Sequence, residues 1–395
     1  MNIDALAAEL SHARQSGADA ILTKRDMGMS VAPHPLAYFA NHLTEELAKN
    51  GLPQPIYLTD PQSLGLIEPL FLATWLLQRA VALSSELEAI NAFSELVSTN
   101  RRRMRYVSVV KGVQVLEPVS ISERITLHPE SFLAETERYR SGRLHPHLSG
   151  HHGSFGCVAV YEFEQKGIFL AQEAVEKQDH GLYQQITGDI NSLISLLPLV
   201  SGSGAIAVVS WFEFHEEESI PIRSTGFSYP LDGSLPFSCD LVLAEPLKNV
   251  FGLHQGLSQG TKDHIAIPLD RLNRSRRQNG TPNAAIDLGI ALESLLMDDH
   301  DGKSEISFKM AMRAAFLLGH NAEERKKIFD AVRDVYDLRS AAVHTGRLPS
   351  GKKRKDKPTA TDAIRRGQTI CAELIRQCMH RNDKIGWDDI LFGAE

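Results

Sequence analysis

Arg339 and His344 are the residues of this sequence whose types and spacing could do chemistry together. A guanidinium is a permanent cation, and its planar fork of donors matches the oxygens of a phosphate group. An imidazole has an ordinary pKa of about 6.5, so it can accept or release a proton near neutral pH. Acid–base catalysis at a phosphate ester, with Arg339 stabilising the developing charge, is the chemistry that this pair would suit.

The helix expected over residues 322–344 places Arg339 on its apolar side. The apolar residues share one sector of the helical wheel, with Arg339 near its middle: Ile328, Phe329, Val332, Val335, Tyr336 and Val343. An unpaired guanidinium in an apolar core is strongly unfavourable, so Arg339 must be paired or must line a cleft or an interface. Glu293 is the one charge between Leu288 and Met297, and we expect it to hold Arg339 in orientation.

His344 follows Arg339 by five residues, which is an offset of about 140° on a regular helix. The two side chains would therefore not converge on one straight helix. Thr345-Gly346 supplies the glycine that commonly ends helices. We expect a final turn that can unwind and bring the imidazole towards the guanidinium.

The elements that must position this pair form a helical C-terminal region. Apolar spacing predicts four helices, over Pro282–Met297, Ser304–Leu318, Ala322–His344 and Thr361–His380. An antiparallel bundle is their economical arrangement. The arginine-rich segment Asp270–Gly280 before them is interpreted as a linker or the beginning of a domain.

Residues 1–270 are predicted to form an α+β region around a largely antiparallel sheet. Helices are expected over Ile3–Ala13, Leu36–Leu47, Leu70–Leu96 and, among the strands, Asp189–Leu199. Strands are expected over Arg105–Leu116, Ser122–Leu127, Cys157–Phe163, Gly167–Ala171, Ala205–Phe214 and Cys239–Leu243. The predicted division is a mostly helical region over residues 1–100, a β-rich region over residues 101–270 and a helical bundle over residues 271–395, so the fold class is α+β and multidomain.

The net charge of -7 over 395 residues is unevenly distributed. Residues 1–270 carry 19 Lys and Arg against 31 Asp and Glu, whereas residues 271–395 carry 23 against 18. The basic region is where a polyanion would be sought. No apolar run has the length of a bilayer span, no leader opens the chain and the four cysteines form no CxxC pattern. We therefore expect a soluble, cytoplasmic, thiol-reduced protein without a membrane partner.

The stretch from Tyr336 to Gly346, Tyr-Asp-Leu-Arg-Ser-Ala-Ala-Val-His-Thr-Gly, resembles the HEPN superfamily and, more narrowly, its Apea-like branch. The Ala-Leu-Glu helix Ala285–Leu295 and the alanine- and leucine-rich Ala311–Gly319 extend the resemblance over residues 270–380. The resemblance implies a helical bundle that dimerises and acts as a metal-independent endoribonuclease. The catalytic residues would be Arg339 and His344, which meet their dimer mates across a two-fold cleft. Ser340 directly follows the arginine, as is common in the Apea-like branch.

Cleavage of RNA by its own 2′-hydroxyl needs a base, an acid and a cation at the phosphorane. Two copies of His344 would supply the proton transfers and Arg339 the cation, with Glu293 and Tyr336 as supporting residues and with no metal or cofactor. The expected partners are RNA, either tRNA or mRNA, and a second copy of the chain bound through the C-terminal bundle. The resemblance also implies a toxin or anti-phage effector, in which residues 1–270 sense a phage-derived or cellular trigger.

Other interpretations stay open. Inactive HEPN domains serve as dimerisation or nucleic-acid-binding adaptors, and a nucleotidyl-transfer partner that merely binds nucleic acid or nucleotide is a third interpretation. The basic residues Lys352, Lys353, Arg354 and Lys355 could guide an RNA backbone or lie in a solvated loop. The histidines His145, His147, His151 and His152 lack the further ligands that would complete a zinc or copper site, which favours a solvated loop.

Overall fold

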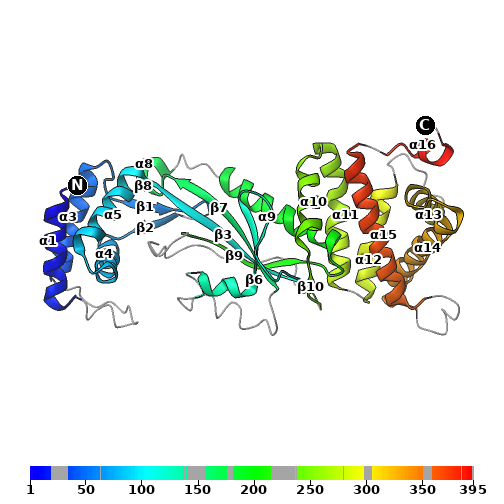
Figure 1. Cartoon of the computed structure of the whole chain (residues 1–395), viewed down its shortest axis with the longest axis horizontal. Helices are drawn as coiled ribbons and strands as arrows, with labels where there is room; N and C mark the ends of the chain where they lie inside the picture. Colours follow the sequence, from blue (N-terminus) through cyan, green and yellow to red (C-terminus); the bar gives the residue numbers. More distant parts are fainter. Residues whose placement is uncertain are drawn as a thin grey trace. The chain divides into compact units, whose positions relative to one another are not determined.

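The computed structural model of the chain is a mixed α/β structure with antiparallel sheets and a helical C-terminal region (Figure 1). It describes residues 1–18, 34–62, 64–136, 139, 156–175, 181–214, 236, 238–278, 280–297, 305–349, 358–383 and 385–393. The chain divides into two compact units. Unit 1 comprises Met1–Val107, Tyr161–Thr187 and Trp211–Ser228, and unit 2 comprises Ser108–Val160, Gly188–Ser210 and Tyr229–Glu395. Within the described residues, no helix has the length and apolar character that crossing a membrane requires.

Unit 1 combines helices with a small sheet. Its helices include α1 Ile3–Ala13, the π turn η1 Arg14–Ala18, α3 His34–Lys49, α4 Pro69–Leu83, α5 Glu86–Thr99 and α8 Gln172–Val175. The sheet has the antiparallel order β2-β1-β8, with β1 Ile56–Thr59, β2 Leu64–Ile67 and β8 Phe169–Ala171.

The prediction of one helix over Leu70–Leu96 is wrong, because two helices, α4 and α5, occupy this range. Ser84 adopts a left-handed conformation that ends α4, and the Ser85 hydroxyl caps α5 by accepting from the Glu88 N–H.

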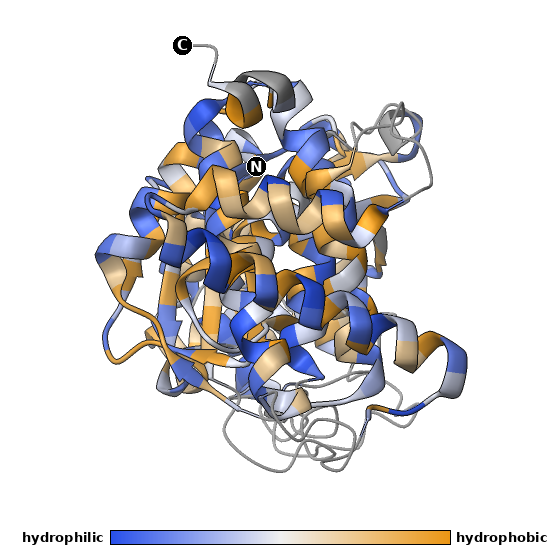
Figure 2. Ribbon diagram, turned by 90° about the vertical axis from the view of Figure 1, so that its right-hand side faces the viewer, coloured by the Kyte–Doolittle hydropathy of each residue, from blue (hydrophilic) through white to orange (hydrophobic). Residues whose placement is uncertain are grey.

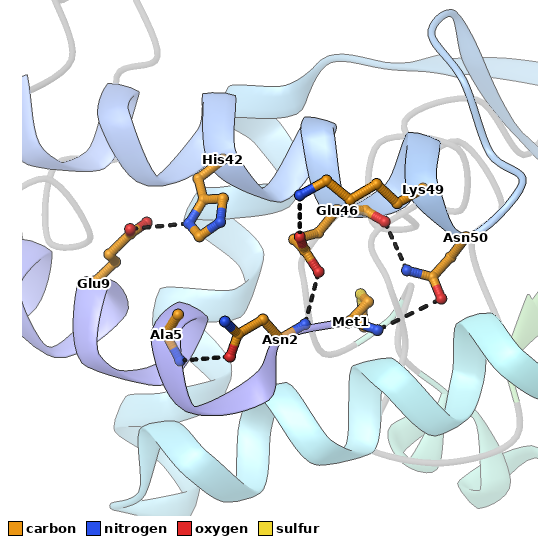
Figure 3. Close-up of polar contacts among 8 residues, drawn as sticks. All are labelled: Met1, Asn2, Ala5, Glu9, His42, Glu46, Lys49 and Asn50. Carbon is orange, nitrogen blue, oxygen red and sulfur yellow. Dashed lines mark hydrogen bonds and ion pairs between the residues drawn. The ribbon is translucent and has the colours of Figure 1, made fainter.

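Polar contacts fasten α1 to α3 within unit 1 (Figure 3). The Glu46 carboxylate accepts hydrogen bonds from the Asn2 backbone N–H at 2.6 Å and from Lys49 Nζ at 2.7 Å. His42 Nδ1 lies 2.9 Å from Glu9 Oε1. The Glu46 side chain is 7% exposed, and the bond from Lys49, followed by that from Asn2, lowers its pKa. The charged form of Glu46 therefore stabilises this end of the unit.

A second sheet has five strands in the order β5-β6-β7-β3-β9. They are β3 Arg101–Lys111, β5 Val119–Ser120, β6 Ile125–Pro129, β7 Cys157–Lys166 and β9 Ile206–Phe214. Strands β5 and β6 pair antiparallel, and a separate parallel pair joins β4 Val113–Gln114 to β10 Asp240–Leu241. The 3₁₀ helix η2 Glu130–Glu135 follows β6, and α9 Gly181–Val200 is longer than the helix expected over Asp189–Leu199. The expected strands are present, with ends shifted by up to several residues, except that Arg105–Leu116 is divided at Gly112 into β3 and β4, which belong to different sheets.

The C-terminal helices of unit 2 are α10 Ala244–Gln255, α11 Gln259–Arg277, α12 Pro282–Leu296, α13 Ile306–Leu318, α14 Ala322–Thr345, α15 Ala360–Arg381 and α16 Trp387–Phe392. Helices α12 to α15 confirm the four predicted helices to within two residues. Figure 2 shows ribbons of mixed orange and blue, so apolar and polar residues occur along the same helices. The interpretation of Asp270–Gly280 as a linker is wrong, because most of this segment is the end of α11.

Two arginines of this region satisfy the carbonyl groups at the end of α9. Arg276 Nη1 donates to the carbonyl oxygens of Pro198 and Ser201, and Arg376 Nη2 donates to that of Leu199. The last carbonyls of a helix lack partners within the helix, so these bonds replace water there. Burial lowers the pKa of the Arg276 guanidinium to about 10. The charge of Arg276 thus has a structural role in unit 2.

Gly367 of α15 sets the distance between α15 and the two helices that carry the predicted site. A Cβ atom at this position would lie 2.4 Å from Val335 Cγ2 of α14 and 2.9 Å from Leu288 Cδ2 of α12. Both distances are far below ordinary van der Waals contact. The absence of a side chain at Gly367 therefore lets α12, α14 and α15 meet.

We expect Gly367→Ala to destabilise unit 2 relative to Gly252→Ala. Gly252 lies inside α10 and its added Cβ would meet nothing within 4 Å, so both variants gain the same helix propensity. Only Gly367→Ala overpacks the core, at a cost of about 1–3 kcal/mol. Urea unfolding of the two variants measures this difference in the free energy of unfolding. Equal stability of the two variants would contradict the close approach at Gly367.

We expect Glu46→Gln to destabilise unit 1 at pH 7 and to do so less at low pH. Because folding lowers the pKa of Glu46, its stabilising contribution is present above the ordinary glutamate pKa of about 4.3 and is lost as the pH falls through the lower folded value. Urea unfolding at pH 7 and near pH 3 measures the effect, with Glu45→Gln, an exposed neighbour, as the control. A difference from wild type that is independent of pH would rule out this role of the Glu46 charge.

Candidate functional site

Arg339 is positioned by the close contact of α12 with α14. A Cβ atom at Gly289 of α12 would lie 2.6 Å from Arg339 Cγ and 3.0 Å from Arg339 Cβ, so the arginine stem passes directly over the glycine. The Arg339 side chain is 30% exposed. The stem is thus fixed in the seam between the helices while part of the guanidinium reaches solvent.

The ion pair predicted between Glu293 and Arg339 is present. Arg339 Nη2 lies 3.5 Å from Glu293 Oε2, and the Glu293 side chain is 37% exposed. This distance is at the outer limit of a hydrogen bond, so the two groups form a weak, partly exposed ion pair. Arg339 Nε is buried and has no hydrogen-bond partner among the residues that the structure describes. A ligand from solvent can therefore meet the exposed part of the guanidinium, but not its Nε atom.

Tyr336 and Ser340 flank Arg339 on α14. The Arg339 Cζ atom lies 5.8 Å from the centre of the Tyr336 ring, which is within the range of a cation–π contact. Both flanking residues are partly exposed. Tyr336 thus contacts the predicted cation directly, whereas Ser340 is its neighbour in sequence, about 100° further round the helix.

The prediction that Arg339 lies in the middle of the packed side of α14 is wrong. Val332 and Val335 are buried as expected, but Ala331, Leu338 and Ala342 extend the buried sector on their other side. Val343, also expected in the apolar stripe, is 55% exposed. Arg339 therefore lies at the margin of the buried sector, beside apolar residues that remain open to solvent.

His344 is exposed in the last turn of α14. Gly346 ends the helix as predicted, with φ +66° and with its N–H donating to the Ala342 carbonyl at 2.9 Å. The expected unwinding of the last turn is not seen, because α14 stays α-helical to Thr345. The offset of about 140° between Arg339 and His344 therefore persists, and one chain does not bring them together.

The remaining predicted groups lie outside the described residues. These are the basic residues Lys352, Lys353, Arg354 and Lys355 and the histidines His145, His147, His151 and His152. Among the residues that are described, no group of three or more His, Cys, Asp or Glu side chains is placed to hold a metal ion.

The sequence reasoning missed the role of Gly289. The signal was present, because glycine is unfavourable inside a helix and its occurrence between Leu288 and Ile290 indicates a close helix contact.

Arg339 and His344 together offer a fixed cation and an exposed proton-transfer group. Bringing them to one phosphate requires a second copy of α14 or a ligand that spans both sides of the helix.

Comparison with family models, with curated proteins and with solved structures finds no match for this chain.

We expect Glu293→Gln to change the stability of unit 2 by less than about 1 kcal/mol, because a partly exposed ion pair contributes little. Asp287→Asn is the matched comparison on the same helix. The Asp287 carboxylate is 10% exposed and accepts from Arg271 Nη1 at 2.9 Å, so its loss should cost about 1.5–3 kcal/mol. Urea unfolding of both variants tests the ranking. If Glu293→Gln were the more destabilising change, Glu293 would be a structural residue instead of an orienting one.

Proposed function

We propose that the chain is a metal-independent endoribonuclease of the HEPN type that cleaves RNA by attack of the 2′-hydroxyl. The observation that carries the proposal is the state of Arg339. Its side chain is partly exposed, its stem is fixed by the seam with α12 and it precedes the exposed His344 by five residues on the same helix. A fixed cation and an exposed proton-transfer group are the components that acid–base chemistry on a phosphate substrate uses.

The sequence resemblance and the helix lengths support the HEPN assignment. The Arg-x4-His stretch lies on α14, the Ala-Leu-Glu stretch on α12, and the alanine- and leucine-rich stretch on α13. Helix α15 completes a bundle in which α12 contacts α13, α14 and α15. The three stretches that carry the resemblance thus lie on consecutive helices of one bundle, which is consistent with the proposed assignment.

We place the active site between two copies of the chain. The Arg339–His344 offset on one regular helix prevents convergence within a single copy. Val343, the neighbour of His344, is 55% exposed, so this end of α14 is open to a contact between copies. A two-fold axis near the end of α14 would supply two guanidinium groups and two imidazoles to one groove.

In this site, one His344 takes the proton of the RNA 2′-hydroxyl while the 2′-oxygen attacks the neighbouring phosphorus. The bond from phosphorus to the leaving 5′-oxygen breaks, and the second His344 gives that oxygen a proton. Arg339 stabilises the negative charge on the non-bridging oxygens throughout. The products end in a 2′,3′-cyclic phosphate and a 5′-hydroxyl, and DNA is inert because it lacks the nucleophile.

The proposal extends to a cytoplasmic toxin or anti-phage effector. In this role residues 1–270 respond to a phage-derived or cellular trigger and restrain the nuclease. Expression of the wild-type chain should then slow cell growth, and Arg339→Ala should remove that effect without reducing the amount of folded protein.

We expect His344→Ala and Arg339→Ala each to lower the rate of RNA cleavage by about 100-fold or more, the usual contribution of a general acid–base group or a positioned cation. The measurement uses labelled tRNA, mRNA and single-stranded DNA with the full chain in EDTA. His380→Ala is the matched control, because His380 is also exposed in the last turn of a helix.

Cleavage by the wild type with 2′,3′-cyclic phosphate ends, lost in the two site variants and kept in His380→Ala, supports the proposal. RNA binding without cleavage would instead identify a non-catalytic adaptor. Cleavage that survives in the Arg339→Ala, His344→Ala double variant would contradict the assignment of the site.

A further inference from the structure

Arginine and aromatic side chains alternate along one side of α14, away from the end that carries His344. We call Arg325, Phe329, Arg333, Tyr336 and Arg339, together with Phe308 and Phe316 of α13, the guanidinium–aromatic strip. The five residues of α14 fall within a sector of about 120° of the helix and extend over about 21 Å of its axis. The strip therefore forms a continuous track that ends at the predicted catalytic arginine.

Each arginine of the strip contacts a ring. Arg325 Cζ lies 4.3 Å from the centre of the Phe316 ring, and Arg333 Cζ lies 5.7 Å from that of Phe329. Arg339 and Tyr336 make the third contact, at 5.8 Å. The three contacts follow one another along α14 from Arg325 to Arg339.

The positive charge of the strip is largely unpaired. Arg325 Nε donates to the Gly319 carbonyl at 3.0 Å, and Arg333 is exposed. Within the described residues, neither arginine has a carboxylate partner. Glu293, at 3.5 Å from Arg339, is the one carboxylate that pairs with an arginine of the strip in the described ranges. The three arginines of the strip and Glu293 sum to a charge of +2, which suits a polyanionic ligand, while exposed Asp330 and Asp337 border the strip beside Arg333.

The rings of the strip are also accessible. Phe308 is 50% exposed, and its ring meets that of Phe329 edge to face, with centres 5.7 Å apart and an interplanar angle of 77°. Phe316, Phe329 and Tyr336 are partly exposed. Ring faces next to unpaired guanidinium groups are the two components from which proteins build binding tracks for unpaired nucleotides, because bases stack and phosphates pair.

We propose that the guanidinium–aromatic strip binds the unpaired strand of an RNA substrate and leads it to Arg339. The inference rests on the proposed nuclease and specifies its substrate as single-stranded. A duplex keeps its bases stacked on one another and cannot use the rings, whereas single-stranded DNA of the same sequence can bind the strip without being cleaved.

The test measures fluorescence anisotropy of labelled 15-nucleotide probes with full-length chains that carry His344→Ala to prevent cleavage. The probes are an unstructured RNA, the RNA duplex and single-stranded DNA. Phe329→Ala and Arg333→Ala should each weaken binding of the single strands by about fivefold or more. Arg333→Ala should also reduce the salt dependence, with the slope of log affinity against log salt smaller by about 0.7.

Lys327→Ala is the matched charge control, because Lys327 lies on the opposite side of α14 and pairs with Glu323 at 2.6 Å. Arg333 is exposed, so its replacement tests the strip even where Phe329→Ala alters folding. Equal affinity for duplex and single strand, or strip variants no weaker than Lys327→Ala, would overturn the proposal. The proposal would also be overturned if the strip variants changed the mass of the protein in sedimentation and left the RNA affinity unchanged. A second copy of the chain would then be what covers the strip.

Failure of the strip and failure of the nuclease give different results. RNA cleavage by the wild type with unchanged cleavage and binding in the strip variants would refute the strip alone. Single-strand binding that depends on the strip, in a wild-type chain that cleaves nothing, would support the strip and refute the nuclease.

Discussion

The contact between α12 and α14 at Gly289 is the constraint on which the candidate site depends. Any larger residue there would collide with the Arg339 stem, since even a Cβ atom would lie 2.6 Å from Arg339 Cγ. Glu293 follows Gly289 by four residues and therefore lies one turn along the same side of α12, within reach of the guanidinium. Gly367 brings α15 against α12 and α14 in the same way. The orientation of Arg339 is thus a consequence of helix packing in unit 2.

The regularity of α14 then decides what kind of site can form. Because the helix continues to Thr345, Arg339 and His344 lie on different sides of it, and their joint use by one substrate calls for a second copy of α14 or a ligand that spans both sides of the helix. The strip that runs from Arg325 to Arg339 lies on the same helix but extends away from His344. One helix can therefore carry a strand-binding track along its length and a contact between copies at its C-terminal end.

Helices α12 to α15 could be predicted because their apolar spacing and capping residues agree. The Glu293–Arg339 pair could be predicted because an unpaired charge at a packed seam is costly. Helix α11 was missed although Ile265, Leu269 and Leu272 have helical spacing, because its last turns bury Ser275, Arg276 and Arg277, polar residues that were interpreted as part of a linker. The position of Arg339 in the middle of the apolar sector was wrong because alanines, which fit a close helix contact, make up a share of the packed side of α14. For α11 and for the position of Arg339, tertiary packing determined which residues are buried.

Cysteine cross-linking at Val343 tests most directly whether the ends of two α14 helices meet. Val343 is 55% exposed next to His344, and Leu87 of unit 1, 46% exposed, is the control position. Under mild oxidation, we expect Val343→Cys to form a disulfide-linked species of twice the 43.7 kDa chain mass, and Leu87→Cys and the wild type to form none. A Val343→Cys chain that sediments as a monomer and cross-links no more than Leu87→Cys would contradict a site shared by two copies.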